Sequence, residues 1–566
     1  MRGSLAALTA IGVSALVTSA ASAAPAQPFF TALPASGTTQ LATERGYATA
    51  TTLPSGKVLI AGGYNGTGFL NSIELFDPAG PSFGSVSATS ERAYAVAAPL
   101  PGGHVLFAGG YPTYQFQTAS LFDPSDNSIT NLVAAAPTQP TAARAGAVAA
   151  PLPDGKVLIA GGTPNFPPTG AVRTAEIFDP ADNSFTALPA SGNTQLTVAR
   201  RGAVAAPLPD GKVLIAGGTE NLDDGTLLRS AEIFDPADDS FTALPASGNT
   251  QLATGRITAV AAALPDGQVL ITGGWDGVST ALATAELFDP DTNTFSSLPA
   301  SGNTQLATGR RDPVAAVLHD GRVLITGGGS AGSGSFLKTA ELFTPAPAAR
   351  ATGTDLGSLV VGTPSANRTV TVTNKGAQDL VITPGTLSVT SASGAAGDFT
   401  LVDETCAGAT LSYKDTCTIT VRFTPSATGA RSATIDLPDN EPSGTGTIKL
   451  TGTGLPIPPP PAPAHGDPPG GTSSGAPAPA TTSAKVTPKA RCTARRSAKT
   501  KRTRITCTVT GLTASGAKAR LTRQGKTIGS ARLTASGRLV ITTKARVKPG
   551  TYRLTIGTTK LTVRVR

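Results

Sequence analysis

The feature that most constrains this chain is a unit that repeats six times in its first two thirds. Each unit begins at an arginine, carries a turn glycine eleven residues later, and has a Gly-Gly pair six residues beyond that glycine. The repeated arginines are Arg45, Arg92, Arg144, Arg200, Arg256 and Arg310. A period of roughly 50 residues is typical of repeat folds, in which one unit cannot bury its apolar surface alone and must pack on its neighbours.

Each unit has the pattern of four short strands. The segment RGAVAAPLPDGKVLIAGG consists of two apolar runs joined by a Pro-Asp-Gly turn, which predicts a hairpin. The segment AEIFDPADNSFTALP predicts a second hairpin around a turn rich in Asp and Asn. Six four-stranded units arranged radially bury both faces of each unit, so the sequence predicts an all-β fold with a six-bladed β-propeller.

The two ends of the repeat region complement each other. The sixth unit ends at Phe343-Thr344-Pro345 and lacks the final strand of the other units. The missing pattern, FTALP, occurs instead at residues 30–34, before the first repeated arginine. We therefore expect an N-terminal strand to complete the last blade and to remove the open edge of the ring.

The repeated Gly-Gly pair, the following Glu-x-Phe-Asp-Pro stretch and the aromatic residue on the fourth strand resemble the Kelch repeat family. The resemblance covers residues 28–346, although Phe stands where Kelch units usually carry Trp. It includes the galactose-oxidase type of propeller, but this region has no Cys, and His104 and His319 fall in hairpin turns. We therefore expect no catalytic residue, no cofactor and no metal, and a propeller that binds a partner.

The loops between the Gly-Gly pair and the third strand vary in length from unit to unit. Loops of this kind gather on one face of a propeller and commonly carry binding residues. They contain the aromatic residues Tyr64, Phe69, Tyr111, Tyr114 and Trp275. Aromatic side chains bury a large area with little loss of entropy, which predicts a face that recognises protein or glycan. The alternative is that the rings only pack one loop against another.

The six repeated arginines have two possible roles. They could line the mouth of the central channel, where Kelch proteins often bind acidic partners. Alternatively, each could pair with a glutamate of its own blade; the candidates are Glu74, Glu176, Glu232, Glu286 and Glu341. A residue that occurs in every blade serves the blade more often than a single ligand, which favours the structural role.

The N-terminus predicts export. Arg2 precedes a short apolar stretch and an Ala-Ser-Ala site, so residues 1–23 have the pattern of a signal peptide, and no later run is long enough to span a membrane. We expect a secreted or surface-associated protein. In an oxidising compartment the cysteines would pair locally, as Cys406 with Cys417 and Cys492 with Cys507. Four cysteines allow three connectivities in all.

Three further regions follow the repeats. Residues 350–454 alternate strands and turns, which predicts an immunoglobulin-like sandwich, and their TVTNKGAQDLVI and CTITVRFTPSATG segments resemble Hydin-like and "choice-of-anchor D" domains. Residues 455–483 are a linker rich in Pro, Gly and Ser.

Residues 484–566 predict a small β-sandwich with 9 Lys, 13 Arg and no Asp or Glu. This charge favours contact with an anionic cell-wall polymer or another polyanion, although a merely solvated surface is the alternative. The scarcity of aromatic residues argues against specific recognition of nucleic acid.

Together these features predict an exported modular binding protein. The propeller would supply the recognition face, and the immunoglobulin-like and basic domains would attach the protein to a surface. Two alternatives remain at this point. The propeller could be an enzyme acting on glycans, which would require a cluster of carboxylates in its central mouth, or it could be a structural spacer in an extracellular assembly.

Overall fold

A computed structural model describes residues 24–86, 92–112, 117–133, 137–165, 170–221, 226–278, 281–330, 335–390, 396–444 and 446–458, and seven strands between Lys489 and Val565. The predicted signal peptide and most of the predicted linker lie outside these residues. In the described part of the chain, no helix is long and apolar enough to cross a membrane.

The repeat region forms six four-stranded antiparallel sheets, as expected for a six-bladed propeller. Blades one and two contain β2 (Thr49–Thr52), β3 (Val58–Ala61), β4 (Ile73–Asp77), β5 (Ser82–Val86), β6 (Val96–Pro99), β7 (Val105–Ala108), β8 (Ala119–Asp123) and β9 (Ser128–Asn131). Blades three and four contain β10 (Val148–Pro151), β11 (Val157–Ala160), β12 (Ala175–Asp179), β13 (Ser184–Ala187), β14 (Val204–Pro207), β15 (Val213–Ala216), β16 (Ala231–Asp235) and β17 (Ser240–Ala243). Blades five and six contain β18 (Val260–Ala263), β19 (Val269–Thr272), β20 (Ala285–Asp289), β21 (Thr294–Ser297), β22 (Val314–Val317), β23 (Val323–Thr326), β24 (Ala340–Thr344) and β1 (Phe29–Ala32).

Apolar cores lie between neighbouring blades. The second strand of each blade, such as β11, is buried at all four positions, because its two faces pack on different neighbours. Leu158 of β11, for example, shares a core with Val213 and Ile215 of the next blade. This arrangement explains why these strands are continuous apolar runs, whereas the first strands of the blades, such as β10 and β14, alternate between buried and partly exposed positions.

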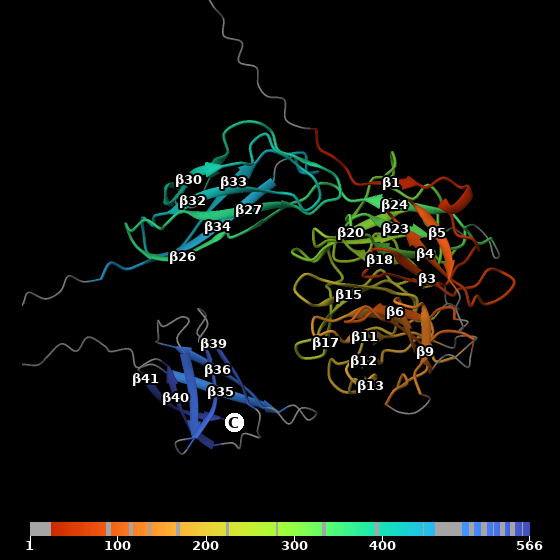
Figure 1. Ribbon diagram of the computed structural model, residues 1–566, viewed down its shortest axis with the longest axis horizontal. Coiled ribbons are helices and arrows are strands. Elements are labelled where there is room, and N and C mark those ends of the chain that lie inside the picture. Colours follow the sequence, from red (N-terminus) through yellow and green to blue (C-terminus); the bar gives the residue numbers. More distant parts are fainter. Residues whose placement is uncertain are drawn as a thin grey trace, which may run out of the picture. The chain divides into compact units, whose positions relative to one another are not determined.

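The first strand of the chain belongs to the last blade. β1 pairs antiparallel with β24, and Figure 1 shows the two strands side by side. The rings of Phe30 and Phe343 are 4.9 Å apart, matching the 4.8 Å between Phe178 and Phe185 on the third and fourth strands of blade three. Around the ring, the inner strands of consecutive blades contact each other, and the inner strand of blade six, β22, contacts β2 of blade one.

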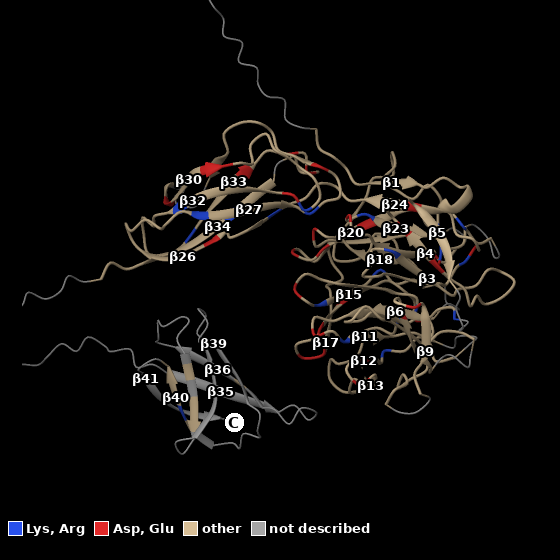
Figure 2. Cartoon of the chain, in the orientation of Figure 1, with Lys and Arg blue, Asp and Glu red and all other residues tan. Residues whose placement is uncertain are grey.

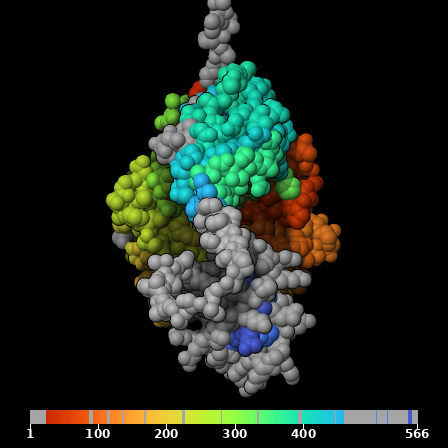
Figure 3. Space-filling model, turned by 90° about the vertical axis from the view of Figure 1, so that its left-hand side faces the viewer, coloured from red at the N-terminus to blue at the C-terminus, as the bar shows by residue number. Residues whose placement is uncertain are grey.

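Residues 349–455 form two further four-stranded sheets around one core. Figure 3 shows this region as one contiguous body, coloured green to cyan. Its sheets contain β25 (Ala349–Thr352), β27 (Arg368–Asn374), β32 (Thr416–Phe423), β30 (Phe399–Glu404), β26 (Asp355–Val360), β34 (Gly446–Leu455), β33 (Gly429–Leu437) and β29 (Ser388–Thr390). A small sheet of β28 (Leu380–Val381) and β31 (Thr410–Leu411) and the helical turn η3 (Ala396–Asp398) complete it; a similar turn, η1 (Gly37–Thr39), follows β1. The predicted disulfide between Cys406 and Cys417 is present, and both residues belong to the core.

The chain from Pro461 onward is a separate compact unit. Its described strands are β35 (Lys489–Arg496), β36 (Thr503–Thr510), β37 (Lys518–Arg523), β38 (Lys526–Arg532), β39 (Arg538–Thr543), β40 (Gly550–Ile556) and β41 (Thr559–Val565). The sequence predicts two sheets here, but all seven strands share one, because β41 pairs with both β40 and β35. Cys492 and Cys507 lie directly opposite each other in the register of β35 and β36.

Candidate functional site

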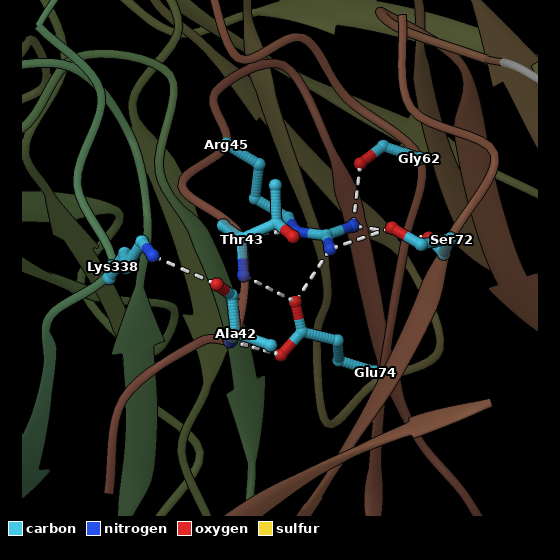
Figure 4. Close-up of polar contacts among 7 residues, drawn as sticks. All are labelled: Ala42, Thr43, Arg45, Gly62, Ser72, Glu74 and Lys338. Carbon is cyan, nitrogen blue, oxygen red and sulfur yellow. Dashed lines mark hydrogen bonds and ion pairs between the residues drawn. The ribbon is translucent and has the colours of Figure 1, made fainter. Parts of the chain in front are cut away.

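The six repeated arginines are buried inside the blades. In five blades the guanidinium group forms an ion pair with the glutamate of the third strand, as Figure 4 shows for Arg45 and Glu74. The N–O distances are 2.6 Å for Arg45–Glu74, 2.6 Å for Arg144–Glu176, 2.7 Å for Arg200–Glu232, 2.7 Å for Arg256–Glu286 and 3.0 Å for Arg310–Glu341. In blade two Ser120 occupies the glutamate position, 3.5 Å from Arg92. This geometry corresponds to the structural role and not to a channel mouth.

Each arginine also connects two backbone segments of its blade. Arg45 donates a hydrogen bond of 2.9 Å to the carbonyl of Gly62, the first glycine of the Gly-Gly pair, and the same bond recurs in all six blades. The second carboxylate oxygen of Glu74 accepts the N–H of Ala42 at 2.8 Å. The ion pair therefore holds together the entry to the inner strand, the Gly-Gly corner and the third strand.

The Gly-Gly pair joins one blade to the next. The N–H of its second glycine donates to the carbonyl of the repeated arginine in the following blade; Gly63 bonds to Arg92 at 2.7 Å, and Gly328 of blade six bonds to Arg45 at 2.8 Å. The first glycine lies so close to this carbonyl that a Cβ on Gly62 would be 2.2 Å from it. Only glycine fits at such a contact with a positive φ.

The second residue after each repeated arginine forms a closed ring of backbone hydrogen bonds. We call this the axial ring; it consists of Tyr47, Tyr94, Gly146, Gly202, Thr258 and Asp312. Each N–H donates to the carbonyl of the ring residue in the preceding blade, at 2.7 to 3.3 Å, and Tyr47 donates to Asp312. All six residues have φ between 53° and 64°. A cycle with one residue from each blade encircles the propeller axis, so these residues mark one end of the central channel.

The side chains of the axial ring are unequal around the axis. Tyr47 and Tyr94 stack with ring centroids 4.2 Å apart, whereas two blades contribute only glycine. Burial raises the pKa of Asp312 to about 7, although Thr258, Arg311 and Tyr47 act in the opposite direction. Burial, with a further contribution from the Asp312 charge, raises the pKa of Tyr47 to about 12. The phenols and the carboxyl group therefore form one polar cluster at the axis, in which Asp312 gains and loses its proton near neutral pH.

Aromatic side chains extend from the axial ring over blades one, two and six. We call this the aromatic cluster; it consists of Tyr47, Tyr64, Phe69, Tyr94, Tyr111 and Phe336. Successive ring centroids are separated by 4.2 Å for Tyr94–Tyr47, 6.1 Å for Tyr47–Phe336, 5.8 Å for Phe336–Tyr64, 5.3 Å for Tyr64–Phe69 and 4.7 Å for Phe69–Tyr111. All six residues are partly exposed. The cluster is therefore a surface of rings in mutual contact that solvent, or a ligand, reaches.

The predicted aromatic residues divide into two groups. Tyr64, Phe69 and Tyr111 come together in the aromatic cluster. Trp275 occupies the position of Tyr64 in blade five, where it pairs with Ile257, and no described ring contact joins it to the cluster. Tyr114 lies outside the described residues.

Sequence reasoning missed Tyr47, Tyr94, Phe336 and Asp312. The available signal was position, because three of them stand two residues after a repeated arginine, at a position where the six units differ. Phe336 lies in a loop of the kind already identified, but in the sixth unit.

The opposite end of the inner strands has a different character. A cavity of about 540 Å³ there is lined by hairpin turns of blades one, two and six and by Tyr413 and Lys414. Lys414 donates to the carbonyl of His319 at 3.2 Å. Figure 2 shows acidic residues at hairpin turns of the propeller, where lysines pair with them in blades one, three and four. This end is thus built from turns and exposed ion pairs, and it has no counterpart of the aromatic cluster among the described residues.

Within the described residues, no group of three or more His, Cys, Asp or Glu side chains is arranged to hold a metal ion. The axial ring and the aromatic cluster can instead bind through ring faces, phenolic hydroxyl groups and charges. A family model described as "Kelch motif" matches residues 256–301, which span the start of blade five to the residues after β21. No curated protein matches the chain. The chain is therefore similar to a Kelch repeat in this unit, and the six four-stranded sheets are consistent with a Kelch propeller.

Proposed function

We propose that this protein is a binding protein whose propeller recognises an extracellular protein or glycan through the aromatic cluster. The observation that carries the proposal is the set of six partly exposed rings in mutual contact beside the axial ring. A cluster needed only for the fold would be buried and would recur in every blade, as the repeated arginines do. The Kelch motif supports the same role, because Kelch propellers are known for protein interaction.

The other regions fit attachment of this propeller outside the cell. Residues 1–23 would direct export, and the protein would be secreted or associated with a cell surface. The region from 349 to 455 would act as an immunoglobulin-like spacer. The basic C-terminal unit, with 22 Lys and Arg from residue 485 onward and no Asp or Glu, would contact an anionic wall polymer through non-specific electrostatic attraction. The protein would then bind without catalysing a reaction.

The double substitution Tyr64→Ala and Tyr111→Ala tests the recognition face. The full-length protein and this variant would be applied to an array of bacterial, plant and animal glycans and to a panel of extracellular proteins. Removing two rings from a desolvated contact weakens binding by about tenfold or more, so we expect the captured ligand to be lost. Tyr413→Ala is the matched control, because it removes one tyrosine ring from the region outside the propeller and should retain the ligand. Equal capture by all three proteins would refute recognition by this face.

A further inference from the structure

Three positions in each blade form the mouth of the central channel on the side of the aromatic cluster. They are the first and second residues after the repeated arginine, and the residue after the Gly-Gly pair, which bridges to the first of these. Among all these positions, only Arg201, Arg311 and Asp312 carry ionisable groups other than tyrosine. The next acidic residues along the chain are Glu220 and Asp276, one position beyond the mouth. The charge of the mouth is therefore set mainly by two cations and one buried acid.

The charge of each arginine reaches a tyrosine of the axial ring. The charge of Arg201 lowers the pKa of Tyr94, opposing the effect of burial, and the charge of Arg311 acts in the same way on Tyr47. Arg311 packs against Gly329, where an added Cβ would be 2.9 Å from its Nε. This Nε is buried, and no hydrogen-bond acceptor satisfies it in the described structure. Arg201 and Arg311 are themselves only partly buried, so the exposed part of each guanidinium group can donate charge-assisted hydrogen bonds to an anionic ligand group.

The mouth has two chemically different halves. Blades one, two and six supply the aromatic cluster, whereas blades three to five supply Gly146, Gly202, Thr258 and Arg201, with Ile257 and Trp275 in blade five. At Gly146 a Cβ would meet only one atom, at 3.6 Å, so there is space for a ligand beside this residue, whereas a Cβ on Gly202 would be 2.4 Å from Ile257. Sugar rings pack their apolar faces on aromatic side chains, and carboxylates take the forked hydrogen bonds of arginine.

We propose that the mouth binds an acidic saccharide, with uronate carboxylates held by Arg201 and Arg311 and a sugar ring packed on the aromatic cluster. This inference rests on the proposed recognition function and names its ligand class. A cationic ligand is disfavoured by the two guanidinium groups. A neutral glycan would offer no charge to the two guanidinium groups. An acidic peptide would use the arginines without needing the wide, partly exposed ring surface.

The buried carboxyl group gives this binding a dependence on pH. The groups that face Asp312 are Tyr47, Thr258 and Arg311, and its charge also reaches Tyr94. When Asp312 takes up a proton, the three mouth positions of the blades lose the one carboxylate that they contain, while a uronate ligand stays ionised. Binding should therefore tighten by several-fold between pH 8 and pH 6. The Asp312→Asn variant should show no such change.

The test measures binding of a tetrasaccharide of 1,4-linked galacturonic acid to the full-length protein by calorimetry at physiological salt. The carboxyl-reduced tetrasaccharide and tetraglutamate are the comparison ligands. The Arg201→Gln/Arg311→Gln variant should bind the acidic sugar about tenfold or more weakly. The Lys156→Gln/Lys212→Gln variant makes the same charge change in the hairpin turns at the opposite end and should bind like the wild type. Any contribution from the basic C-terminal unit is equal in all these proteins.

Two results would overturn the acidic-saccharide proposal. The first is that the neutral sugar or tetraglutamate binds as tightly as the acidic tetrasaccharide, or more tightly. The second is that the Arg201→Gln/Arg311→Gln and Lys156→Gln/Lys212→Gln variants bind the acidic tetrasaccharide equally well. If Tyr64→Ala/Tyr111→Ala abolishes binding of some other ligand while the arginine variant does not, the recognition face stands and only the ligand class is wrong. If neither variant changes binding of any ligand, the proposed function fails as well.

Discussion

Adjacent positions at the start of each blade are used in opposite ways. The repeated arginine is the same in all six blades, is buried, and pairs with a glutamate of its own blade in five of them. The next two residues differ from blade to blade and face the mouth of the channel. The comparison shows how a six-fold backbone carries an asymmetric surface: the invariant positions build the ring, and the variable positions beside them supply aromatic groups, arginine or space.

The same comparison separates the two kinds of charge in the propeller. The arginine–glutamate pairs have almost no exposed side-chain surface, whereas the lysine–aspartate pairs of the hairpin turns are about one fifth to nearly one half exposed. Buried pairs are strongly coupled to folding, because removing one partner leaves an uncompensated charge, while exposed pairs are screened by water. The predictions below use this difference, and the single Trp, Trp275, reports unfolding of the propeller by its fluorescence.

The largest effect is expected from Arg200→Ala, which leaves Glu232 buried without its cation. We expect the free energy of unfolding to fall by about 3 to 5 kcal/mol, because the remaining carboxylate has no counter-charge in the core. Urea titration followed by the fluorescence of Trp275 measures this change. Binding by the fraction that remains folded should be unaltered. If Arg200→Ala left the free energy of unfolding unchanged but abolished binding, the repeated arginine would be a binding residue and not a structural one.

A smaller effect, of opposite sign, is expected from Asp312→Asn. The pKa of Asp312 rises from 3.8 in the unfolded chain to about 7 in the fold, so the unfolded state releases its proton first as the pH increases. The wild type therefore loses unfolding free energy between about pH 4 and pH 7, on the order of 2 to 4 kcal/mol. The Asn variant cannot titrate in this range. Its unfolding free energy minus that of the wild type should therefore be larger at pH 8 than at pH 4.5. Urea titrations at the two pH values test this; a constant difference between the proteins would contradict it.

The smallest effect is expected from Lys212→Ala, in the same blade as Arg200. Its ammonium lies 3.6 Å from both Asp210 and Asp235, and its side chain is 40% exposed. We expect the free energy of unfolding to change by less than about 1 kcal/mol, because water and salt screen such a pair. The same fluorescence assay, at low and high salt, provides the measurement. A loss comparable to that of Arg200→Ala would show that burial does not distinguish the two kinds of pair.

Much of the ring and part of the candidate site follow from the sequence by position alone. The spacing from Arg45 to Gly62 recurs in all six units. Because the units share this spacing, the hydrogen bond between the arginine and the glycine carbonyl also recurs in each of them. The displaced FTALP segment marks the fourth strand of blade six for the same reason. Tyr64, Phe69 and Tyr111 are found from variable loop length, because loops of one kind collect on one face. Trp275 also lies in such a loop. It belongs to blade five, however, whereas the aromatic cluster lies on blades one, two and six, and no described ring contact joins them.

The sequence by itself determined the number of blades and the four strands in each, since these depend on local pattern and on repetition. Only the tertiary structure decided which residues meet at the axis. Tyr47 and Asp312 are 265 positions apart, and their adjacency arises because blade six meets blade one. The same closure buries Asp312 and raises its pKa, and it places Phe336 between Tyr47 and Tyr64. A periodic pattern specifies what all blades share, whereas a site made from their differences exists only once the ring has formed.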